Sequence, residues 1–259
     1  MSIFLIPLTA LLASILTFFS GFGLGTILLP VFTIYYDAPI AVGLTAIVHF
    51  LNNVFKIGLV YKNINWQVVL KFGIPSLLAA ILGAYLLKLI SNQSIILGSY
   101  QLNNHTFSIS LFNIIIGLLI IFFSFFEVIP YFKNLSFNQN KLTFGGLLSG
   151  FFGGLSGHQG ALRSAFLIQL QLSKESFVAT GTAIACAVDI ARISVYAITF
   201  DFANVKSNAT ILIIAVIAAF LGAYIGNKLL KKTTLSFLKW FVTIFMVMIA
   251  LLMMIGFLG

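Results

Sequence analysis

The sequence predicts an all-α integral membrane protein of about eight transmembrane helices, counting two broken helix pairs as hairpins. Of its 259 residues, 61% are hydrophobic and only 7% are charged, and the mean hydropathy is +1.13. A soluble domain carries about 25% charged residues. Apolar stretches long enough to cross a hydrocarbon core of about 30 Å recur from end to end with short polar breaks. We therefore expect one membrane domain in the lipid bilayer and no separate soluble domain.

Polar breaks divide the chain into apolar segments at 2–20, 24–36, 39–61, 66–90, 107–130, 142–157, 160–172, 176–199, 206–230 and 236–258. The segments 24–36 and 160–172 are too short to cross, since about 13 helical residues span roughly 20 Å. Each follows a glycine-containing break, SGFGLG at 20–25 and GGLSGHQG at 153–160. We expect each short segment to pair with the one before it as a hairpin that enters and leaves on one side.

The lysines test this topology. With two hairpins and six crossings, only Lys88 and Lys206 fall at one face of the membrane. The opposite face collects Lys62, Lys71, Lys133, Lys141, Lys174, Lys228, Lys231, Lys232 and Lys239. Positive residues concentrate in cytoplasmic loops. The crowded face is therefore predicted to be cytoplasmic, with both termini and the loop Ser91–His105 extracytoplasmic and the loop Tyr131–Asn140 cytoplasmic.

Short motifs recur half a chain apart. Ala41-Val-Gly43 matches Ala179-Thr-Gly181, and Leu82-Gly-Ala-Tyr85 matches Leu221-Gly-Ala-Tyr224. We divide the chain into a first repeat at 1–135 and a second at 136–259. Each has one hairpin and three crossings, an odd number, so the second repeat enters from the opposite side. Inverted repeats of this kind are common in secondary transporters.

The two breaks are the candidate binding site, because unwound backbone at membrane depth is tolerated only inside protein or beside a watery cavity. A helix that resumes after a break also points free N–H groups at the cavity, which suits an anion. Arg163, in the first turn after the second break, has a planar fork that matches two oxygens of an oxyanion. The alternatives are that the glycines only allow close packing, and that Arg163 pairs with Asp189. The break residues concerned are Gly23, Gly25, Gly157, His158, Gln159 and Gly160.

Two further polar groups interrupt the apolar helices. His49, Asn52, Asn53 and Lys56 recur at spacings of three and four, so they form one stripe that we expect to face the interior. Asp189 and Arg192 are three apart and can pair on one side of their helix. Two roles stay open for each acid–base candidate. Asp189 is a structural partner of Arg192 or a proton acceptor, and His49 is a titrating group or a hydrogen-bonded structural histidine.

Several function classes are excluded. The basic residues lie scattered at helix ends, so no nucleic-acid partner is expected. Cys186 is the sole cysteine, and no metal-ligand cluster, phosphate loop or cofactor motif occurs, so neither metal nor cofactor is expected. Gly154-Leu-Ser-Gly157 matches the GxSG of intramembrane serine proteases with Ser156 as nucleophile. We expect His158 to be poorly placed as its base and no histidine follows, which leaves a protease as a remote alternative to a non-enzyme.

The motifs GFGLGTILLP at 21–30 and SGHQGALRSA at 156–165, with AVGLT at 41–45 and ATGTA at 179–183 after them, resemble the TauE/SafE family of sulfite exporters. The resemblance covers nearly the whole chain. It implies an inner-membrane, multi-pass transporter of sulfur-containing anions such as sulfite, sulfoacetate and other organosulfonates. The family usually has three consecutive glycines in the break, where this chain has Gly23-Leu-Gly25 and His158-Gln-Gly160.

We therefore expect an exporter that holds a small sulfur oxyanion at the membrane midplane between the two breaks. Arg163 binds the anion, the break glycines and Gln159 donate to it, and His49, Asn52 and Asn53 form the facing wall. An anion channel and a permease for a non-sulfur substrate are the alternatives. The oligomeric state is not predicted.

Overall fold

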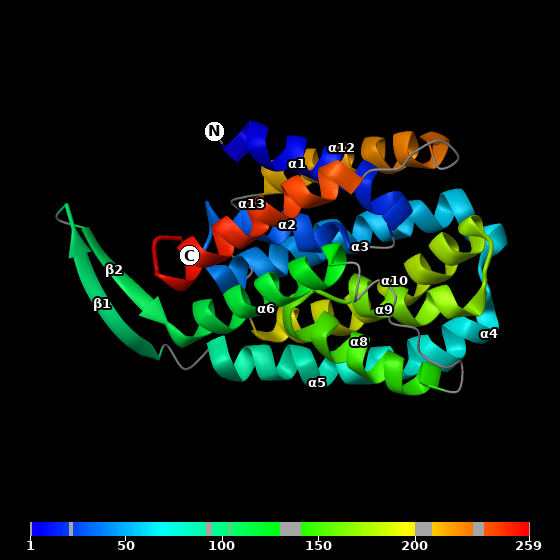
Figure 1. The fold of residues 1–259 in the computed structure, drawn as a ribbon, viewed down its shortest axis with the longest axis horizontal. Helices are drawn as coiled ribbons and strands as arrows, with labels where there is room; N and C mark the ends of the chain where they lie inside the picture. Colours follow the sequence, from blue (N-terminus) through cyan, green and yellow to red (C-terminus); the bar gives the residue numbers. More distant parts are fainter. Residues whose placement is uncertain are drawn as a thin grey trace.

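The computed structural model describes residues 2–20, 23–91, 95–103, 105–129, 141–199, 209–229 and 236–258. Its helices lie alongside one another, most of them close to the long axis of the molecule (Figure 1). The first half contains α1 (Ser2–Ser20), α2 (Leu24–Thr33), α3 (Ala38–Val60), α4 (Trp66–Val68), α5 (Ile74–Ser91) and α6 (Leu111–Val128). The second half contains α8 (Leu142–Ser156), α9 (Gly160–Leu167), α10 (Lys174–Thr199), α12 (Ala209–Leu229) and α13 (Ser236–Met254).

Both predicted breaks are present. α1 ends at Ser20, and α2 begins at Leu24 after the extended residue Gly23. α8 ends at Ser156, and the φ of 83° at the next residue, Gly157, lies in the left-handed region that glycine tolerates. Both short segments end earlier than predicted, α2 at Thr33 and α9 at Leu167. A 3-10 turn at Ile168–Leu170 extends α9. Neither α2 nor α9 is long enough to cross a bilayer alone.

In the part of the chain that the structure describes, four helical stretches are long and apolar enough to cross a membrane by themselves: Ala38–Asn63, Trp66–Ser91, Lys174–Ile198 and Ala209–Lys228. They correspond to four of the six predicted crossings. The second stretch includes a π-helical turn at Val69–Gly73 between α4 and α5. The other two predicted crossings correspond to α6 and α13, whose apolar parts are shorter. The chain is a helical membrane protein, and the total of eight spans stays a prediction.

A β-hairpin departs from the all-α prediction. Strand β1 (Ile96–Leu102) pairs antiparallel with β2 (His105–Ser110), and α6 begins only at Leu111, so the helix predicted from residue 107 is wrong for its first turn. Hydropathy cannot separate a short apolar strand from a helix end. Phe107 stacks on Phe257 at 5.1 Å between ring centroids, which ties the hairpin to the end of the chain.

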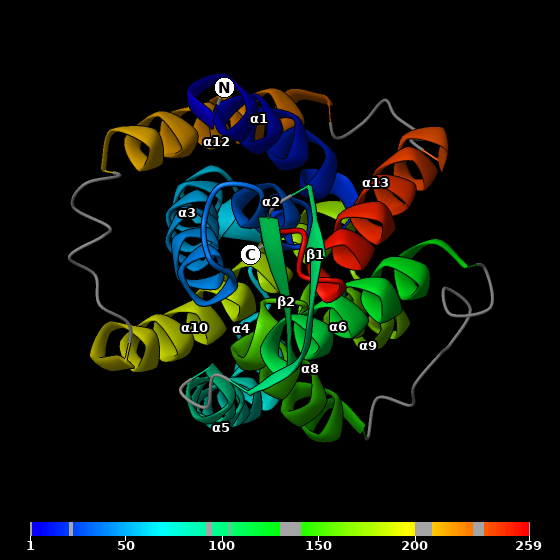
Figure 2. The same cartoon turned by 90° about the vertical axis from the view of Figure 1, so that its left-hand side faces the viewer.

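The hairpin marks one end of the molecule. Figure 1 shows the start of α1 and the end of α13 near this end, and α4 at the opposite end. Figure 2 looks onto the hairpin end, with the helices gathered behind it. The predicted topology requires this placement of the termini and of the Ser91–His105 segment at one end. Its cytoplasmic loop, Tyr131–Asn140, lies outside the described residues.

Glycines let α5 and α8 pack closely. A Cβ on Gly150 of α8 would lie 2.0 Å from the carbonyl oxygen of Ser76 on α5, so only glycine fits there. The motif glycine Gly83 on α5 likewise faces Phe151 of α8, where a Cβ would lie 2.0 Å from the carbonyl oxygen. Small residues at such positions allow transmembrane backbones to approach. The α5–α8 and α1–α12 pairs are the most extensive helix contacts among the described elements.

Candidate functional site

A buried polar network centred on Asp189 joins α3, α10 and the second break. Asp189 is fully buried on α10. Its Oδ2 lies 2.6 Å from Nδ1 of His49 and accepts a hydrogen bond from Nδ2 of Asn53 at 3.1 Å. Its Oδ1 accepts from Nε of Arg192 at 2.9 Å and, more weakly, from Nε2 of Gln159 at 3.5 Å. The network connects residues 140 positions apart in sequence, which no spacing rule could have found.

The predicted pair between Asp189 and Arg192 is present. A second guanidinium nitrogen of Arg192 lies 2.8 Å from Oδ1, an ion pair that lacks hydrogen-bond alignment. Arg192 is 1% exposed and lies against the break, where a Cβ on Gly157 would come within 2.7 Å of its NH1 nitrogen. Gly157 is therefore required both by its positive φ and by the space that Arg192 occupies.

Arg163 reaches the same network through Gln159. Its NH1 donates to Oε1 of Gln159 at 3.4 Å, and the amide of Gln159 in turn donates to Asp189. Among the described residues, Asp189 makes ion pairs with Arg192 and His49. A bridge through Gln159 thus takes the place of the direct Arg163–Asp189 pair, the alternative that the sequence left open. Arg163, in the first turn of α9, is 5% exposed.

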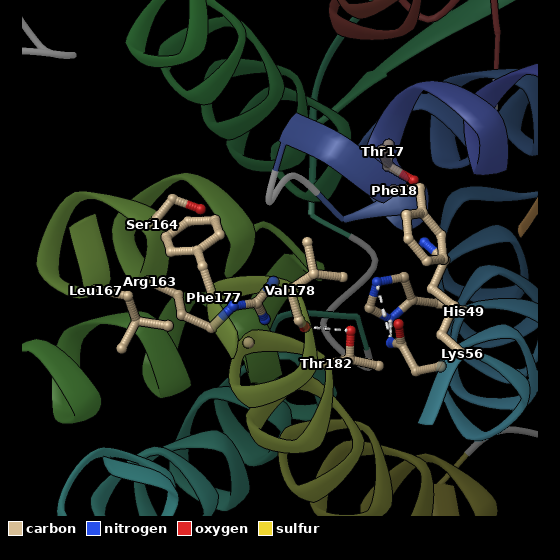
Figure 3. Close-up of a pocket in the computed structure, with 12 residues that line it drawn as sticks. Thr17, Phe18, His49, Lys56, Arg163, Ser164, Leu167, Phe177, Val178 and Thr182 are labelled. Carbon is tan, nitrogen blue, oxygen red and sulfur yellow. Dashed lines mark hydrogen bonds between the residues drawn. The ribbon is translucent and has the colours of Figure 1, made fainter. Parts of the chain in front are cut away.

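A small cavity lies beside this network, between the end of α1, the second half of α3, α9 and the start of α10 (Figure 3). Its volume is about 20 Å³, room for one or two water molecules. None of the described residues that line it is acidic. The lining residues are Thr17, Phe18, His49, Asn53, Lys56, Arg163, Ser164, Leu167, Phe177, Val178, Gly181 and Thr182.

The stripe predicted on α3 does face the interior. His49, Asn52, Asn53 and Lys56 are all at most 5% exposed. Three of them line the cavity, but Asn52 does not, because its Oδ1 accepts a hydrogen bond at 3.1 Å from Ser14 of α1. The structure thus places Asn52 in the α1–α3 contact instead of on the cavity wall.

The glycines of the first break lie behind His49. A Cβ on Gly23 would come within 3.1 Å of Nε2 of His49, and one on Gly25 within 3.4 Å of a methyl group of Thr45. These glycines let the break approach the imidazole ring. Neither lines the cavity, and neither does Gly160, the first residue of α9.

Comparison with protein families decides what kind of protein carries this site. A family model described as sulfite exporter TauE/SafE matches residues 6–253, nearly the whole chain. The chain belongs to the TauE/SafE family. The resemblance inferred from the sequence motifs is confirmed, and membership implies a membrane transporter of sulfite or related anions. No curated protein and no solved structure matched the chain.

One prediction about the TauE/SafE chain needs correction. His158 lies close to Ser156, with Nδ1 3.0 Å from Oγ, because the positive φ of Gly157 turns the backbone back on itself. Ser156 Oγ nevertheless donates to the carbonyl of Phe152 at 3.2 Å, and the His158 ring stacks on Phe123. Neither Ser156 nor His158 lines the cavity. TauE/SafE proteins are transporters, and this pair gives no support to a protease.

Sequence reasoning missed the contributions of α1. Thr17 and Phe18 line the cavity although nothing in their apolar surroundings marks them. Lys56 was recognised as part of the α3 stripe but not as a site residue, although its spacing of seven from His49 places both on one face of the helix.

Proposed function

We propose that this TauE/SafE protein exports sulfite or an organosulfonate and binds the anion in the cavity beside Arg163. The observation that carries the proposal is a buried guanidinium in the wall of a cavity whose described lining contains no acid. A guanidinium fork donates two parallel hydrogen bonds to two oxygens of a sulfonate or sulfite group. Gln159 accepts a hydrogen bond from the Arg163 fork, and His49 lies on the opposite side of the cavity (Figure 3). Asn53 also belongs to the cavity lining.

The depth of the cavity fits uptake from the cytoplasm. His49 lies at the middle of α3 and Lys56 seven residues nearer the α4 end, roughly 10 Å along the helix. Under the predicted topology the α4 end is cytoplasmic. An exporter whose site lies between the midplane and the cytoplasmic end is positioned to load from inside.

The size of the cavity favours a carrier over a channel. The cavity has room for about one or two water molecules, fewer than the four non-hydrogen atoms of a sulfite ion, so the walls must part to admit the ion. A carrier alternates between such closed and open arrangements, whereas a conducting channel keeps a continuous path. Saturating flux is the expected kinetic signature.

An inverted repeat provides the moving parts, and its contacts support it. Gly83 of the first LGAY motif packs against α8, the first helix of the second half. Gly222 of the second motif packs against α1, the first helix of the first half, where a Cβ would lie 2.3 Å from the carbonyl oxygen of Leu11. The contacts α3–α10 and α6–α13 each join corresponding helices of the two halves. If each helix is replaced by its counterpart in the other half, these contacts are reproduced, as expected for two repeats of one structure.

Variants of Arg163 test the proposal. Purified wild-type protein should gain thermal stability with added sulfite, since a ligand that binds the folded state stabilises it. Arg163→Gln should melt near wild type without ligand and lose the sulfite-dependent shift, and Arg163→Lys should retain only part of it because the fork is lost. Ser156→Ala serves as the control and should keep both binding and flux. A full sulfite shift in Arg163→Gln would reject the site.

A further inference from the structure

Lys56 is a second cation in the cavity wall, and the proposed function does not use it. It lies on α3, two turns from His49, and its side chain is 4% exposed. Figure 3 shows Arg163 entering the cavity region from α9, with His49 and Lys56 on the other side on α3. A charged side chain at membrane depth is expensive and is usually paired or functional.

The contacts of Lys56 leave its ammonium available. Nζ lies 5.4 Å from the centre of the Phe18 ring, a cation–π contact. Among the described residues, neither a carboxylate nor a hydrogen-bond acceptor contacts it. The nearest acid of the network, Asp189, is occupied by His49 and Arg192. The ammonium group has three N–H donors, and the contact with the Phe18 ring does not give any of them a conventional hydrogen-bond acceptor.

A hydroxyl group on the same wall is also unpaired. Thr17 Oγ1 is buried and lacks a hydrogen-bond partner among the described residues, although Thr17 lines the cavity. A buried polar atom without a partner is unusual in a native structure and calls for a ligand or water. Lys56 and Thr17 therefore offer donors to a guest on the side away from Arg163.

We propose that Lys56 makes the cavity select doubly charged sulfur oxyanions over singly charged ones. The proposal rests on the anion-binding function proposed above. Two cations that face one buried cavity repel each other strongly where the dielectric is low, so Lys56 adds to the positive potential that Arg163 creates. A dianion such as sulfite gains from both charges. A monoanion with the same oxygens gains only about half as much electrostatic binding energy from the Lys56 charge as a dianion does.

The competing explanation is that Lys56 is a topological lysine whose charge extends toward the nearby helix end. Lys62 provides the matched control. It lies just beyond the end of α3, is exposed, and also has an aromatic partner, with Nζ 5.9 Å from the Tyr61 ring. A purely topological role predicts that Lys56 and Lys62 variants behave alike toward anions.

The test compares two probes that present the same three sulfur-bound oxygens, sulfite above neutral pH, with two charges, and methanesulfonate, with one. Thermal shift and calorimetry on the purified full chain should show sulfite binding about tenfold or more tighter than methanesulfonate. Lys56→Gln should reduce this preference several-fold, because sulfite binding loses about twice as much as methanesulfonate binding. Lys56→Arg should preserve the preference in part, and Lys62→Gln should match wild type.

Each outcome decides a different claim. Wild-type protein that binds neither probe overturns the proposed function and this inference together. Equal wild-type affinities, or a Lys56→Gln variant with the sulfite preference intact, overturn the role of Lys56 alone. Lys56→Met is a second variant without the charge, which tests the same role if Lys56→Gln misfolds. Both should melt no lower than wild type without ligand because the repulsion from Arg163 is relieved, and a large loss of melting temperature in both would assign Lys56 a structural role instead.

Discussion

Replacing Asp189 with asparagine should destabilise the protein more than any other single change in the polar network. The carboxylate is fully buried and receives contacts from His49, Asn53, Gln159 and Arg192. Its loss leaves the Arg192 guanidinium, itself 1% exposed, without its ionic partner. Removing one member of a buried ion pair costs about 3–5 kcal/mol. For a chain of this size that lowers the melting temperature by on the order of 10 °C.

Replacing Arg192 should lower the melting temperature less than replacing Asp189. In Arg192→Gln, Asp189 keeps His49 and Asn53, so a smaller loss is expected, and the double variant with Asp189→Asn should lose less than the sum of the two. Thermal unfolding of the purified variants in detergent measures this. Asp37→Asn is the control, because Asp37 is exposed at the start of α3 and its side chain makes no capping hydrogen bond. Wild-type melting of Asp189→Asn would refute the reasoning.

Two further predictions concern packing and topology. Gly150→Ala should lower the melting temperature, because its Cβ would lie 2.0 Å from the Ser76 carbonyl oxygen. Such overpacking costs about 1–3 kcal/mol of stability. The control Gly58→Ala, with open space around it, should melt at or slightly above the wild-type temperature. In a cysteine-free background, an impermeant thiol reagent on intact cells should label Gln101→Cys and spare Asn138→Cys, and the reverse labelling would invert the topology.

Hydropathy predicted the helices well and the connections less well. The four long apolar helices begin and end within a few residues of their predicted positions, because a span must cover about 30 Å of hydrocarbon whatever it packs against. The β-hairpin at Ile96–Ser110 was missed. Most of its residues were predicted to form the loop Ser91–His105, and the strands depend on cross-strand pairs such as Tyr100 with Phe107, whose rings stack at 5.4 Å between centroids.

The sequence predicted which charged residues belong to the candidate site but did not predict their partners, and this difference has a physical reason. Buried charges stand out in an apolar chain, so Arg163, Asp189, Arg192 and the α3 stripe could be singled out from the sequence. Their partners could not. The bridge from Arg163 through Gln159 to Asp189 depends on where the second break places its side chains.

The sequence by itself determined that this is a helical membrane protein of the TauE/SafE family, with glycine breaks and a few buried charges. These properties follow from composition and local spacing, which do not depend on how the helices pack. Only the tertiary structure decided that His49 contacts Asp189, that Asn52 turns to α1, and that Lys56 shares a cavity with Arg163. Such contacts join helices far apart in the chain, and they depend on helix rotation and on close approaches at glycines such as Gly150.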